Sequence, residues 1–346
     1  MAAYDGLFNS LGLREWCDQG IAAGGDKPMS MAELMARANA QQVDAPWWDV
    51  PFPSLDNLNK ACDAFPRTRD MTSGVEQIFL DVKDGLKLVL DPLTQPLSWM
   101  LDYGLWFFTS MPWWVLIPLL LVGTWFAARS LAVTAFVAVT FLFFAFIDHY
   151  DYAIQTLTII FICTALSVML GVPIGIAMSK NDTFQRSMIP VLDMLQTLPS
   201  FVYLIPLIFL FSVTEPKLYG IAIILYAIVP VIRLTDLGIR LVDKDVIEAA
   251  DAFGMTSRQK LFGVEIPLAM PNIMAGVNQT IMMALAMVVI ASLVSAPGLG
   301  TLVLRGIRNL ELGVGLVSGL GIVLLAVILD RVSKAALRRI NVAQQQ

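Results

Sequence analysis

Histidine, cysteine and charged residues are all scarce in this chain of 346 residues, which has one histidine, three cysteines and 15% charged side chains. Soluble domains carry about 25% charged residues. The sequence contains no Gly-x-x-x-x-Gly-Lys-[Ser/Thr] phosphate loop and no pairing of a nucleophile with a base. We therefore expect a protein that is not an enzyme, with no catalytic residue, no metal, no cofactor and no nucleic-acid partner.

The three cysteines show no C-x-x-C spacing, which argues against a zinc site or a dithiol motif. Cys163 lies in an apolar run and is expected to pack there. Cys17 and Cys62 could form a disulfide if the N-terminal region faces an oxidising compartment. The sequence does not decide whether they pair.

We also expect no cleavable signal peptide at the start of this sequence. The first 30 residues contain four acidic side chains and no apolar run long enough for the core of such a peptide. We expect the segment that carries the N-terminal region across a membrane to lie downstream of it.

Hydrophobic residues are abundant and clustered. They make up 57% of the chain, and almost all of the long apolar runs follow residue 110. Apolar runs of about 20 residues can cross a bilayer as helices. The sequence therefore predicts an all-α, polytopic transmembrane helix bundle of about seven spans behind a long polar N-terminal tail. The predicted spans lie near residues 112–128, 131–147, 153–177, 188–213, 218–235, 272–296 and 312–330.

Two small-x-x-x-small patterns occur within these runs, one at Gly171 and Gly175 and the other at Gly315 and Gly319. Small residues at this spacing let two helices approach closely. The patterns indicate packing within a bundle and no particular function.

The tail, residues 1–110, is acidic: it contains eight Lys or Arg and fifteen Asp or Glu, a net charge of −7. Ser73 and Glu76 form an S-x-x-E capping box, and apolar residues then recur at helical spacing. We predict an amphipathic helix near residues 73–90. It could lie on the membrane surface or on the flank of the bundle, or it could be a packing helix of a globular domain.

Basic residues gather in two connections, at 178–187 and 236–271, and after the last span. These segments share one side of the membrane if there are seven spans, and the positive-inside rule places that side in the cytoplasm. The acidic tail is then outside, and residues 336–346 are cytoplasmic. The basic connection 297–311 is an exception, because it must face out.

The sequence thus predicts four parts in an inner (plasma) membrane protein with membrane lipid around it. They are the acidic tail at 1–110, two peripheral transmembrane helices at 111–147, a transmembrane core that contains the 236–271 connection at 148–335, and a cytoplasmic tail at 336–346.

The connection 236–271 is long, charged and lies between two spans. Its Glu248-Ala-Ala run favours a helix, and Gly254 permits the positive φ that ends it. A second short helix is predicted after the glycine. Thr256 or Ser257 can cap its start.

Pro267 and Pro271 are expected to stop this second helix before the next span. The two short helices would then meet at an angle on the cytoplasmic face. A bend of this kind suits insertion into a groove on a partner.

Glu248-Ala-Ala, Gly254 and Ile266-Pro267 together resemble the EAA signature of bacterial ABC importer permeases, with an interval between glycine and isoleucine that is a residue or two longer here. In that family the loop docks on the ATP-binding subunit and transmits its movements to the membrane helices. The resemblance implies that ATP hydrolysis belongs to a separate chain. It assigns coupling to Glu248, Ala249, Ala250, Gly254, Ile266 and Pro267.

Further stretches are similar to the glycine betaine/proline betaine permease subfamily over about residues 145–335. They are LDMLQTLPSFVYLIP at 192–206, PLAMPNIMAGVNQT at 267–280, MVVIAS at 287–292, and the nearby GLG at 298–300 and LRGI at 304–307. The resemblance implies an osmoprotectant importer for glycine betaine, proline betaine or a similar quaternary amine. It also implies a second permease copy, an ATP-binding subunit and an extracytoplasmic substrate-binding protein as partners.

Polar candidates for a solute pathway occupy two of the predicted spans, where unsatisfied polar groups are costly. They are the consecutive residues Asn278, Gln279 and Thr280 and the helically spaced residues Asp193, Gln196 and Thr197. Each group could line the route or hydrogen-bond neighbouring helices. The carboxylate of Asp193 could also meet a cationic substrate.

A quaternary ammonium has no N–H donor and is commonly held by aromatic faces. Phe201, Tyr203 and Tyr226 are the candidates, although aromatic residues in membranes also simply pack. The resemblance implies that affinity resides mainly in the binding protein, so a dedicated site in the permease is not required.

Other classes remain open. A secondary transporter driven by an ion gradient would need inverted repeats and broken helices with buried charges, and neither a repeat nor a second acidic span is evident. A membrane scaffold would need neither the bent connection nor the polar groups. Within the importer class, the solute could instead be choline, carnitine or an amino acid.

Overall fold

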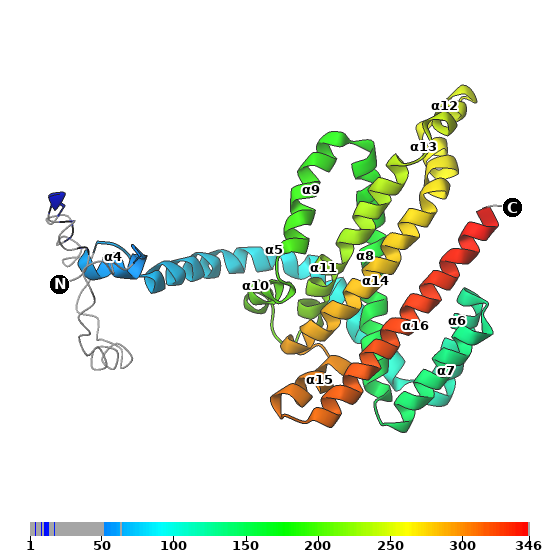
Figure 1. Cartoon of the computed structure of the whole chain (residues 1–346), viewed down its shortest axis with the longest axis horizontal. Coiled ribbons are helices and arrows are strands. Elements are labelled where there is room, and N and C mark those ends of the chain that lie inside the picture. Colours follow the sequence, from blue (N-terminus) through cyan, green and yellow to red (C-terminus); the bar gives the residue numbers. More distant parts are fainter. Residues whose placement is uncertain are drawn as a thin grey trace. The chain divides into compact units, whose positions relative to one another are not determined.

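The computed structural model describes residues 10–13, 52–62 and 64–344, together with Tyr4, Phe8 and Cys17. Every regular element in these residues is helical, which confirms the all-α class. The chain forms two compact units, Met1–Leu86 and Lys87–Gln346 (Figure 1). Most of the predicted tail before residue 52, and the last two residues of the 336–346 segment, lie outside the described residues.

The first unit contains a disulfide bond that the sequence left undecided. Cys17 and Cys62 are bonded to each other, and with Phe8 they form a small buried cluster. Cys62 directly follows helix α4 (Leu55–Ala61), which Ser54 caps by accepting a hydrogen bond from a backbone N–H. The cross-link therefore ties the start of the chain to the end of α4.

Helix α5 (Thr68–Ser110) is longer at both ends than the predicted 73–90 helix. Its start is stabilised by Asp56, whose carboxylate accepts a hydrogen bond from the N–H of Thr68 (2.9 Å). Ser73 is therefore inside the helix, where its hydroxyl donates to the carbonyl oxygen of Asp70 (2.9 Å). The capping-box prediction is wrong because a carboxylate distant in sequence supplies the cap.

The apolar stripe expected on this helix is present and exposed in its first half. Val75, Ile78 and Val82 are each more than half exposed. A stripe of this kind suits a helix that lies on a membrane surface.

The second unit consists of the rest of α5 and the helices that follow it (Figure 1). They are α6 (Trp113–Ala128), α7 (Leu131–Phe146), α8 (Tyr150–Lys180), α9 (Asp182–Thr197), η1 (Ser200–Tyr203), α10 (Leu204–Leu210), α11 (Pro216–Arg240), α12 (Lys244–Ala252), α13 (Ser257–Lys260), η2 (Leu261–Glu265), α14 (Ile266–Ala291), η3 (Ser292–Val294), α15 (Leu299–Arg308) and α16 (Leu312–Gln344).

By length and composition, four helical stretches in the described residues can cross a membrane: α8, α11, Ser257–Val294 and Leu312–Ala336. The number rises to six if each of two bent pairs, α5 with α6 and α9 with α10, forms one span. Helix α7, with 16 residues, is a shorter apolar helix. These four stretches correspond to the predicted segments near 153–177, 218–235, 272–296 and 312–330. The segment 188–213 covers the end of α9 together with α10, and the segments 112–128 and 131–147 coincide with α6 alone and with α7.

The predicted span 188–213 is broken. Its axis turns by 105° between α9 and the η1–α10 stretch. Leu198 and Pro199, at the turn, are both extended, with ψ angles of 133° and 130°. A residue before proline avoids the α region, and proline has no N–H for the helical ladder. The Leu-Pro step therefore ends α9 inside the apolar run.

Helix α11 packs between α8 and α14 and forms the centre of the second unit. Gly171 and Gly175 of α8 face Val231 and Thr235 of α11, and a Cβ at position 175 would lie 2.6 Å from the Cβ of Thr235. The first small-x-x-x-small pattern therefore does bring two helices together, as predicted.

The second small-x-x-x-small pattern makes one close contact only. Gly315 of α16 lies against Gly306 of α15, and a Cβ at Gly306 would be 2.6 Å from Gly315. A Cβ at Gly319 would meet nothing within 4 Å. This pattern therefore packs the short helix α15 on α16 through one of its two glycines.

The C-terminal part of α5 is fastened to the start of α11 by a buried lysine. Lys217 is 4% exposed, and its ammonium group binds the carboxylates of Asp91 (2.7 Å) and Glu215 (2.9 Å). The same group lies 5.1 Å from the ring centroid of Phe211. The buried charge is thus fully compensated, as burial requires.

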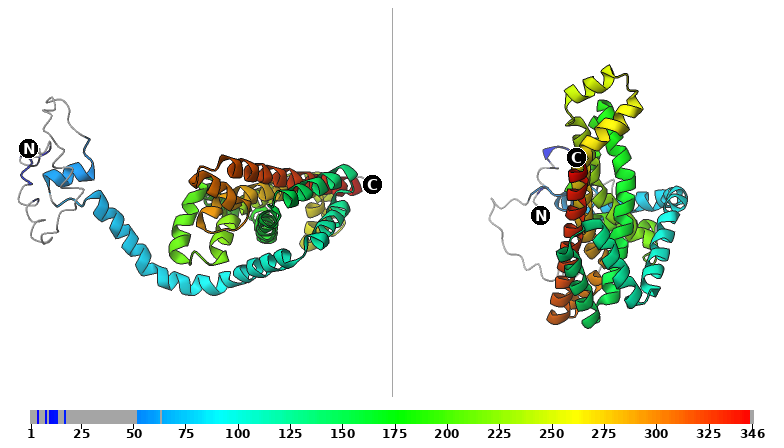
Figure 2. Two further views of the ribbon diagram at one scale, coloured as in Figure 1. Left: turned by 90° about the horizontal axis from the view of Figure 1, so that it is seen from below. Right: turned by 90° about the vertical axis from the view of Figure 1, so that its right-hand side faces the viewer.

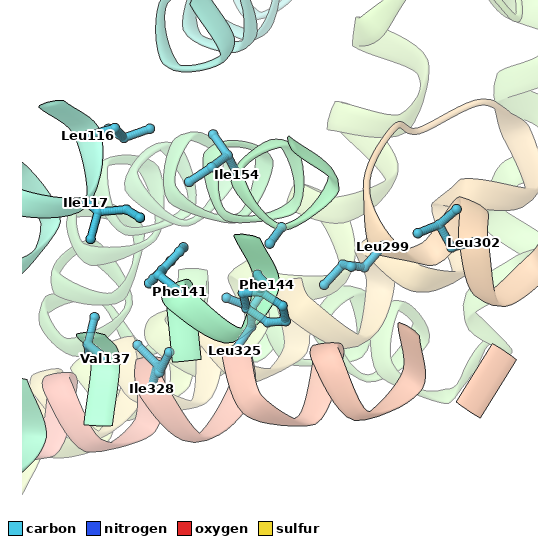
Figure 3. Packing of buried hydrophobic residues seen from close by; sticks show 11 residues of the cluster. Leu116, Ile117, Val137, Phe141, Phe144, Ile154, Leu299, Leu302, Leu325 and Ile328 are labelled. Carbon is cyan, nitrogen blue, oxygen red and sulfur yellow. The ribbon is translucent and has the colours of Figure 1, made fainter. Parts of the chain in front are cut away.

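An apolar cluster joins α6 and α7 to the bundle (Figure 3). Phe141 and Phe144 of α7 are fully buried with their rings edge to face, 5.9 Å apart. Ile154 of α8 and Leu325 of α16 complete the cluster from the bundle side. The two helices of the 111–147 segment therefore pack on the bundle through this cluster.

Replacing Gly175 with alanine should destabilise the bundle, because the added methyl group would press on Thr235 and on the carbonyl oxygen of Ile232, 2.7 Å away. Overpacking of this kind costs about 1–3 kcal/mol. Thermal unfolding of the purified protein in detergent should show a lower midpoint. Gly319→Ala is the matched control, since its methyl group meets nothing within 4 Å. An unchanged midpoint in Gly175→Ala would contradict the close packing of α8 on α11.

Candidate functional site

The elbow, defined here as residues 243–265, connects α11 to α14 and begins with α12. Asp243 caps this helix, because its carboxylate accepts a hydrogen bond from the N–H of Asp245 (3.0 Å). Glu248 and Ala249 are exposed, whereas Ala250 is buried. Of these predicted coupling residues, two therefore face outwards and one packs within the elbow.

Gly254 ends α12 with a left-handed backbone, φ +72°, as the sequence predicts. The N–H of Met255 donates to the carbonyl oxygen of Ala250 (3.2 Å), and the N–H of Gly254 donates to that of Asp251 (2.9 Å). This pair of bonds is a Schellman motif, which satisfies the last carbonyl groups of a helix. A Cβ at Gly254 would meet nothing within 4 Å, so the φ angle alone demands glycine.

The second arm of the elbow is capped as predicted and is tied to the first arm. Thr256 and Gln259 form a capping box at the start of α13. The ammonium group of Lys260 binds both carboxylate oxygens of Asp251 (2.7 and 2.9 Å). An ion pair therefore braces the two arms across the bend.

The prediction that Pro267 and Pro271 stop this second arm is wrong. Helix α13 continues through the π-helical turn η2 into α14, and Pro271 lies within α14. The N–H of Ile266 bonds to the carbonyl oxygen of Leu261, five residues back, which holds the chain helical up to the proline. Pro267 then occupies the start of α14, where a missing N–H is tolerated.

Large aromatic side chains stand at the outer end of the elbow. Phe253 is 87% exposed and Phe262 is 68% exposed, and both line a shallow groove with Gly254 and Gln259. In the right-hand view of Figure 2 the elbow, in yellow, projects beyond the ends of the green helices. Exposed aromatic residues on a polar segment mark an interaction surface. The sequence analysis did not single out either phenylalanine.

A charged cluster lies where the elbow meets the bundle. Arg240, the last residue of α11, binds the carboxylates of Asp236 (2.9 Å) and Asp182 (2.8 Å). It also donates to the carbonyl oxygen of Met178 (2.8 Å), and Gln185 donates to Asp236 (2.6 Å). The ends of α8, α9 and α11 are joined by these contacts.

Glu265, in the π turn, is 3% exposed, and its carboxylate is bound by Lys180, the last residue of α8. The sequence analysis counted Lys180 and Arg240 only as basic residues that set the topology, and it passed over Glu265. A signal was available, because Glu265 is the only acidic residue between Asp251 and Glu311.

The polar strip of α9 is exposed. Gln196 and Thr197 face outwards, and Asp193 forms an ion pair with Arg233 of α11 (2.5 Å). This contact favours the helix-bonding role of Asp193 over that of an unpaired carboxylate facing a cation.

Two of the three aromatic candidates lie together near the break after α9. The rings of Tyr203 and Tyr226 are 6.5 Å apart, and the Tyr203 hydroxyl donates to the carbonyl oxygen of Leu195. Tyr203 is buried, whereas Phe201 is exposed and is not part of this pair.

Asn278, Gln279 and Thr280 point in different directions, as consecutive residues of a helix must. Asn278 accepts a hydrogen bond from Ser333 of α16 (2.5 Å) and lies 3.5 Å from Asp330. Gln279 is exposed. Thr280 is fully buried, and its hydroxyl has no hydrogen-bond partner in the described part of the chain.

The described residues hold no grouping of three or more His, Cys, Asp or Glu side chains that could bind a metal ion. The elbow has an exposed apolar tip, a braced bend and a continuous helix that leads into the bundle. A partner bound at the tip could therefore displace the helix that enters the bundle.

In fold, the chain resembles one from the MetNI methionine ABC transporter in inward facing conformations, with a TM-score of 0.51 and 17% identity over 56% of this chain and 95% of that one. At this identity the likeness concerns the fold alone.

Residues 167–342 match the family described as binding-protein-dependent transport system inner membrane component. The chain is 42% identical over 228 residues to the glycine betaine transport system permease protein OpuAB of Bacillus subtilis, covering 66% of this chain and 76% of that protein. It is 40% identical over 247 residues to the glycine betaine/carnitine transport permease protein GbuB of Listeria monocytogenes, covering 70% and 87%. Identity to the glycine betaine/proline betaine permease ProW of Escherichia coli is 46% over 190 residues, covering 55% and 53%.

The chain therefore belongs to the family of binding-protein-dependent transport system inner membrane components. It is a permease subunit of the inner membrane and not itself an enzyme, and the resemblance noted in the sequence is confirmed.

Replacing Gly254 with valine should uncouple ATP hydrolysis from uptake in the assembled transporter. A β-branched residue resists the left-handed backbone, at a cost of about 1–2 kcal/mol, so the arms should reorient. Membrane insertion should stay normal. Uptake and ATP hydrolysis would be measured on the same preparation.

Gly254→Asn is the matched control, because asparagine adopts the left-handed conformation more readily and the space around position 254 is open. We expect it to keep most of the uptake. Undiminished uptake in the valine variant, or an equal loss in both, would contradict a role for the shape of the elbow.

Proposed function

We propose that this chain is the translocating subunit of an ATP-driven importer for glycine betaine or a related quaternary amine. The observation that carries the proposal is the elbow, an exposed and braced bend that continues as one helix into a membrane span. The substrate class rests on the names of the relatives, which specify glycine betaine alone or together with carnitine or proline betaine. ATP-driven movement of the elbow would drive alternating access.

In this proposal an ATP-binding subunit receives the tip of the elbow. The exposed rings of Phe253 and Phe262 would contact that subunit. The moving part would be formed by the signature residues Glu248, Ala249, Ala250, Gly254, Ile266 and Pro267. Because these residues extend from α12 across the bend to the start of α14, the elbow would act as a lever.

We place the elbow in the cytoplasm and the N-terminal unit outside. Within the second unit, the elbow, the turn between α8 and α9 and the C-terminal end of α16 lie towards one end (Figure 1), and all three carry basic residues. The Cys17–Cys62 disulfide supports an oxidising compartment for the first unit. Residues 148–335 would form the permease core, with the helices of 111–147 beside it.

A second copy of the chain and membrane lipid would cover the apolar surface that one copy leaves open. In the apolar window of α16, 22% of the residues are buried, against 67% in α11. Leu316, Leu320 and Val323 are among the exposed residues of α16. An extracytoplasmic binding protein would deliver the solute at the face opposite the elbow.

We propose that the solute passes the break between α9 and α10. Tyr203 and Tyr226 lie there with their rings 6.5 Å apart, and the exposed ring of Phe201 follows the same break. Aromatic faces attract a quaternary ammonium group. The remaining candidates for this route are Asp193, Gln196, Thr197, Asn278, Gln279 and Thr280.

Reconstitution in liposomes with the ATP-binding subunit and the binding protein tests the proposed function. We expect glycine betaine to stimulate ATP hydrolysis and to accumulate only when ATP is supplied on the elbow side. Competition by choline, carnitine or an amino acid would identify a different solute. Uptake driven by an ion gradient without ATP would contradict the proposal and establish a secondary transporter, and a complete lack of uptake would favour a scaffold.

Cysteine labelling in cells should verify the proposed orientation. An impermeant maleimide should label the chain in intact cells or spheroplasts only after a reductant opens Cys17–Cys62. Cys163, buried in α8, serves as the internal control and should stay unlabelled. Arg258→Cys, on the exposed side of the elbow, should react only after the membrane is permeabilised. Labelling of that cysteine from outside would overturn the importer proposal.

A further inference from the structure

The π turn η2 is the last part of the elbow, leads into α14 and contains a buried carboxylate. The side chain of Glu265 is 4% exposed, whereas that of its partner Lys180 is 45% exposed. A buried carboxylate is costly unless it is paired, so Glu265 holds Lys180 at this place. The ion pair thus links the end of α8 to the turn through which the elbow enters the bundle.

Because Glu265 lies in a π turn, a movement of the elbow relative to α14 would affect its pairing with Lys180. Such turns are rare and occur frequently at functional sites. Helix α13 is one turn long and leads directly into η2, and Pro267 is the second residue after η2. A tilt of the elbow against α14 must therefore pass through η2, and it would displace the carboxylate of Glu265 relative to Lys180.

The other charged contacts near the end of α8 do not connect that helix to the π turn. Arg240 reaches two carboxylates and a carbonyl group, so α9 and α11 are attached to the end of α8 by several bonds. Within the elbow, Lys260 braces Asp251 from the same segment. The pair of Lys180 with Glu265 instead joins the end of α8, which the Arg240 cluster holds, to the part that moves in the proposed function.

We propose that the Lys180–Glu265 ion pair is a latch that positions the π turn against α8 and passes displacement of the elbow to that helix. The inference rests on the proposed function of the elbow as the coupling element. Lys180 and Glu265 are positioning residues: they act through the helices that they join and contact neither ATP nor the solute in this role.

The latch is tested in the reconstituted complex by the number of solute molecules transported per ATP hydrolysed. Glu265→Gln and Lys180→Gln should each lower this ratio by about fivefold or more, a typical size for coupling between sites. ATP hydrolysis should remain within about twofold of its normal rate. The double variant should lose no more than either single variant, because both remove the same interaction.

Glu311→Gln is the matched control. It removes the carboxylate that pairs with Arg305 (3.4 Å) beside α15, away from the elbow, and it should leave the ratio unchanged. Unfolding midpoints and complex assembly would be compared for all variants, and Glu265→Gln, which preserves the size of the side chain, keeps the test informative if Lys180→Gln folds poorly.

A normal ratio in Glu265→Gln would overturn the latch, as would a proportional fall in uptake and ATP hydrolysis with a lowered unfolding midpoint, which indicates a structural role only. Losses that multiply in the double variant would also overturn it. Failure of the proposed function is separate, because it would appear in the unmodified complex as a lack of ATP-dependent uptake.

Discussion

Close backbone contact between α8 and α11 holds the second unit together, and it depends on two glycines one helical turn apart. Apolar side chains gain little by leaving lipid for another helix, so helices in a membrane associate through packing at short range. Gly171 and Gly175 allow this close approach, because Val231 and Thr235 occupy the space where side chains at these two positions would be. Helix α11 also packs against α14. The elbow therefore joins two helices that pack against each other, and in the proposed function this packing would give the lever a firm base.

Ion pairs that each contain one buried side chain, Lys217 or Asp236, determine how the ends of these helices are arranged. At one end of α11, Lys217 is enclosed by Asp91, Glu215 and the ring of Phe211, and this arrangement brings α5 to the bundle. At its other end, Arg240 gathers α8 and α9. An unpaired charge in such places is costly, so each pair constrains two helices at once. The elbow end also carries a polar link to a π turn, because Lys180 at the end of α8 binds Glu265 of η2. In the proposed function, motion that enters there would meet a helix end that is already joined to two others.

Local features of this structure could be predicted from the sequence, and features that depend on distant partners could not. The bend at Gly254 and the cap at Thr256 follow from residues within one turn. The true start of α5 depends on Asp56, twelve residues before Thr68, and the pairing of Lys180 with Glu265 joins residues 85 positions apart. Proline was the least reliable signal for the end of a helix. Pro199 breaks an apolar run, whereas Pro267 does not, because the preceding π turn already holds the chain helical. The contact between Tyr203 and Tyr226, and the different environments of residues 278–280, likewise could not be predicted, because both depend on how the helices are placed.

Glycine serves two opposite purposes in this chain, and the contrast indicates how force can pass through it. At Gly175 the surrounding space is filled, so the residue is required by its neighbours. At Gly254 the space is open, so the residue is required by its own φ angle. The shape of the bend is thus set by its backbone hydrogen bonds and by the Lys260–Asp251 pair, all of which lie inside the elbow. A segment that keeps its shape by internal contacts can be displaced as a body. In the proposed function, its displacement would reach the bundle along the chain, through the end of α11 on one side and through the π turn into α14 on the other.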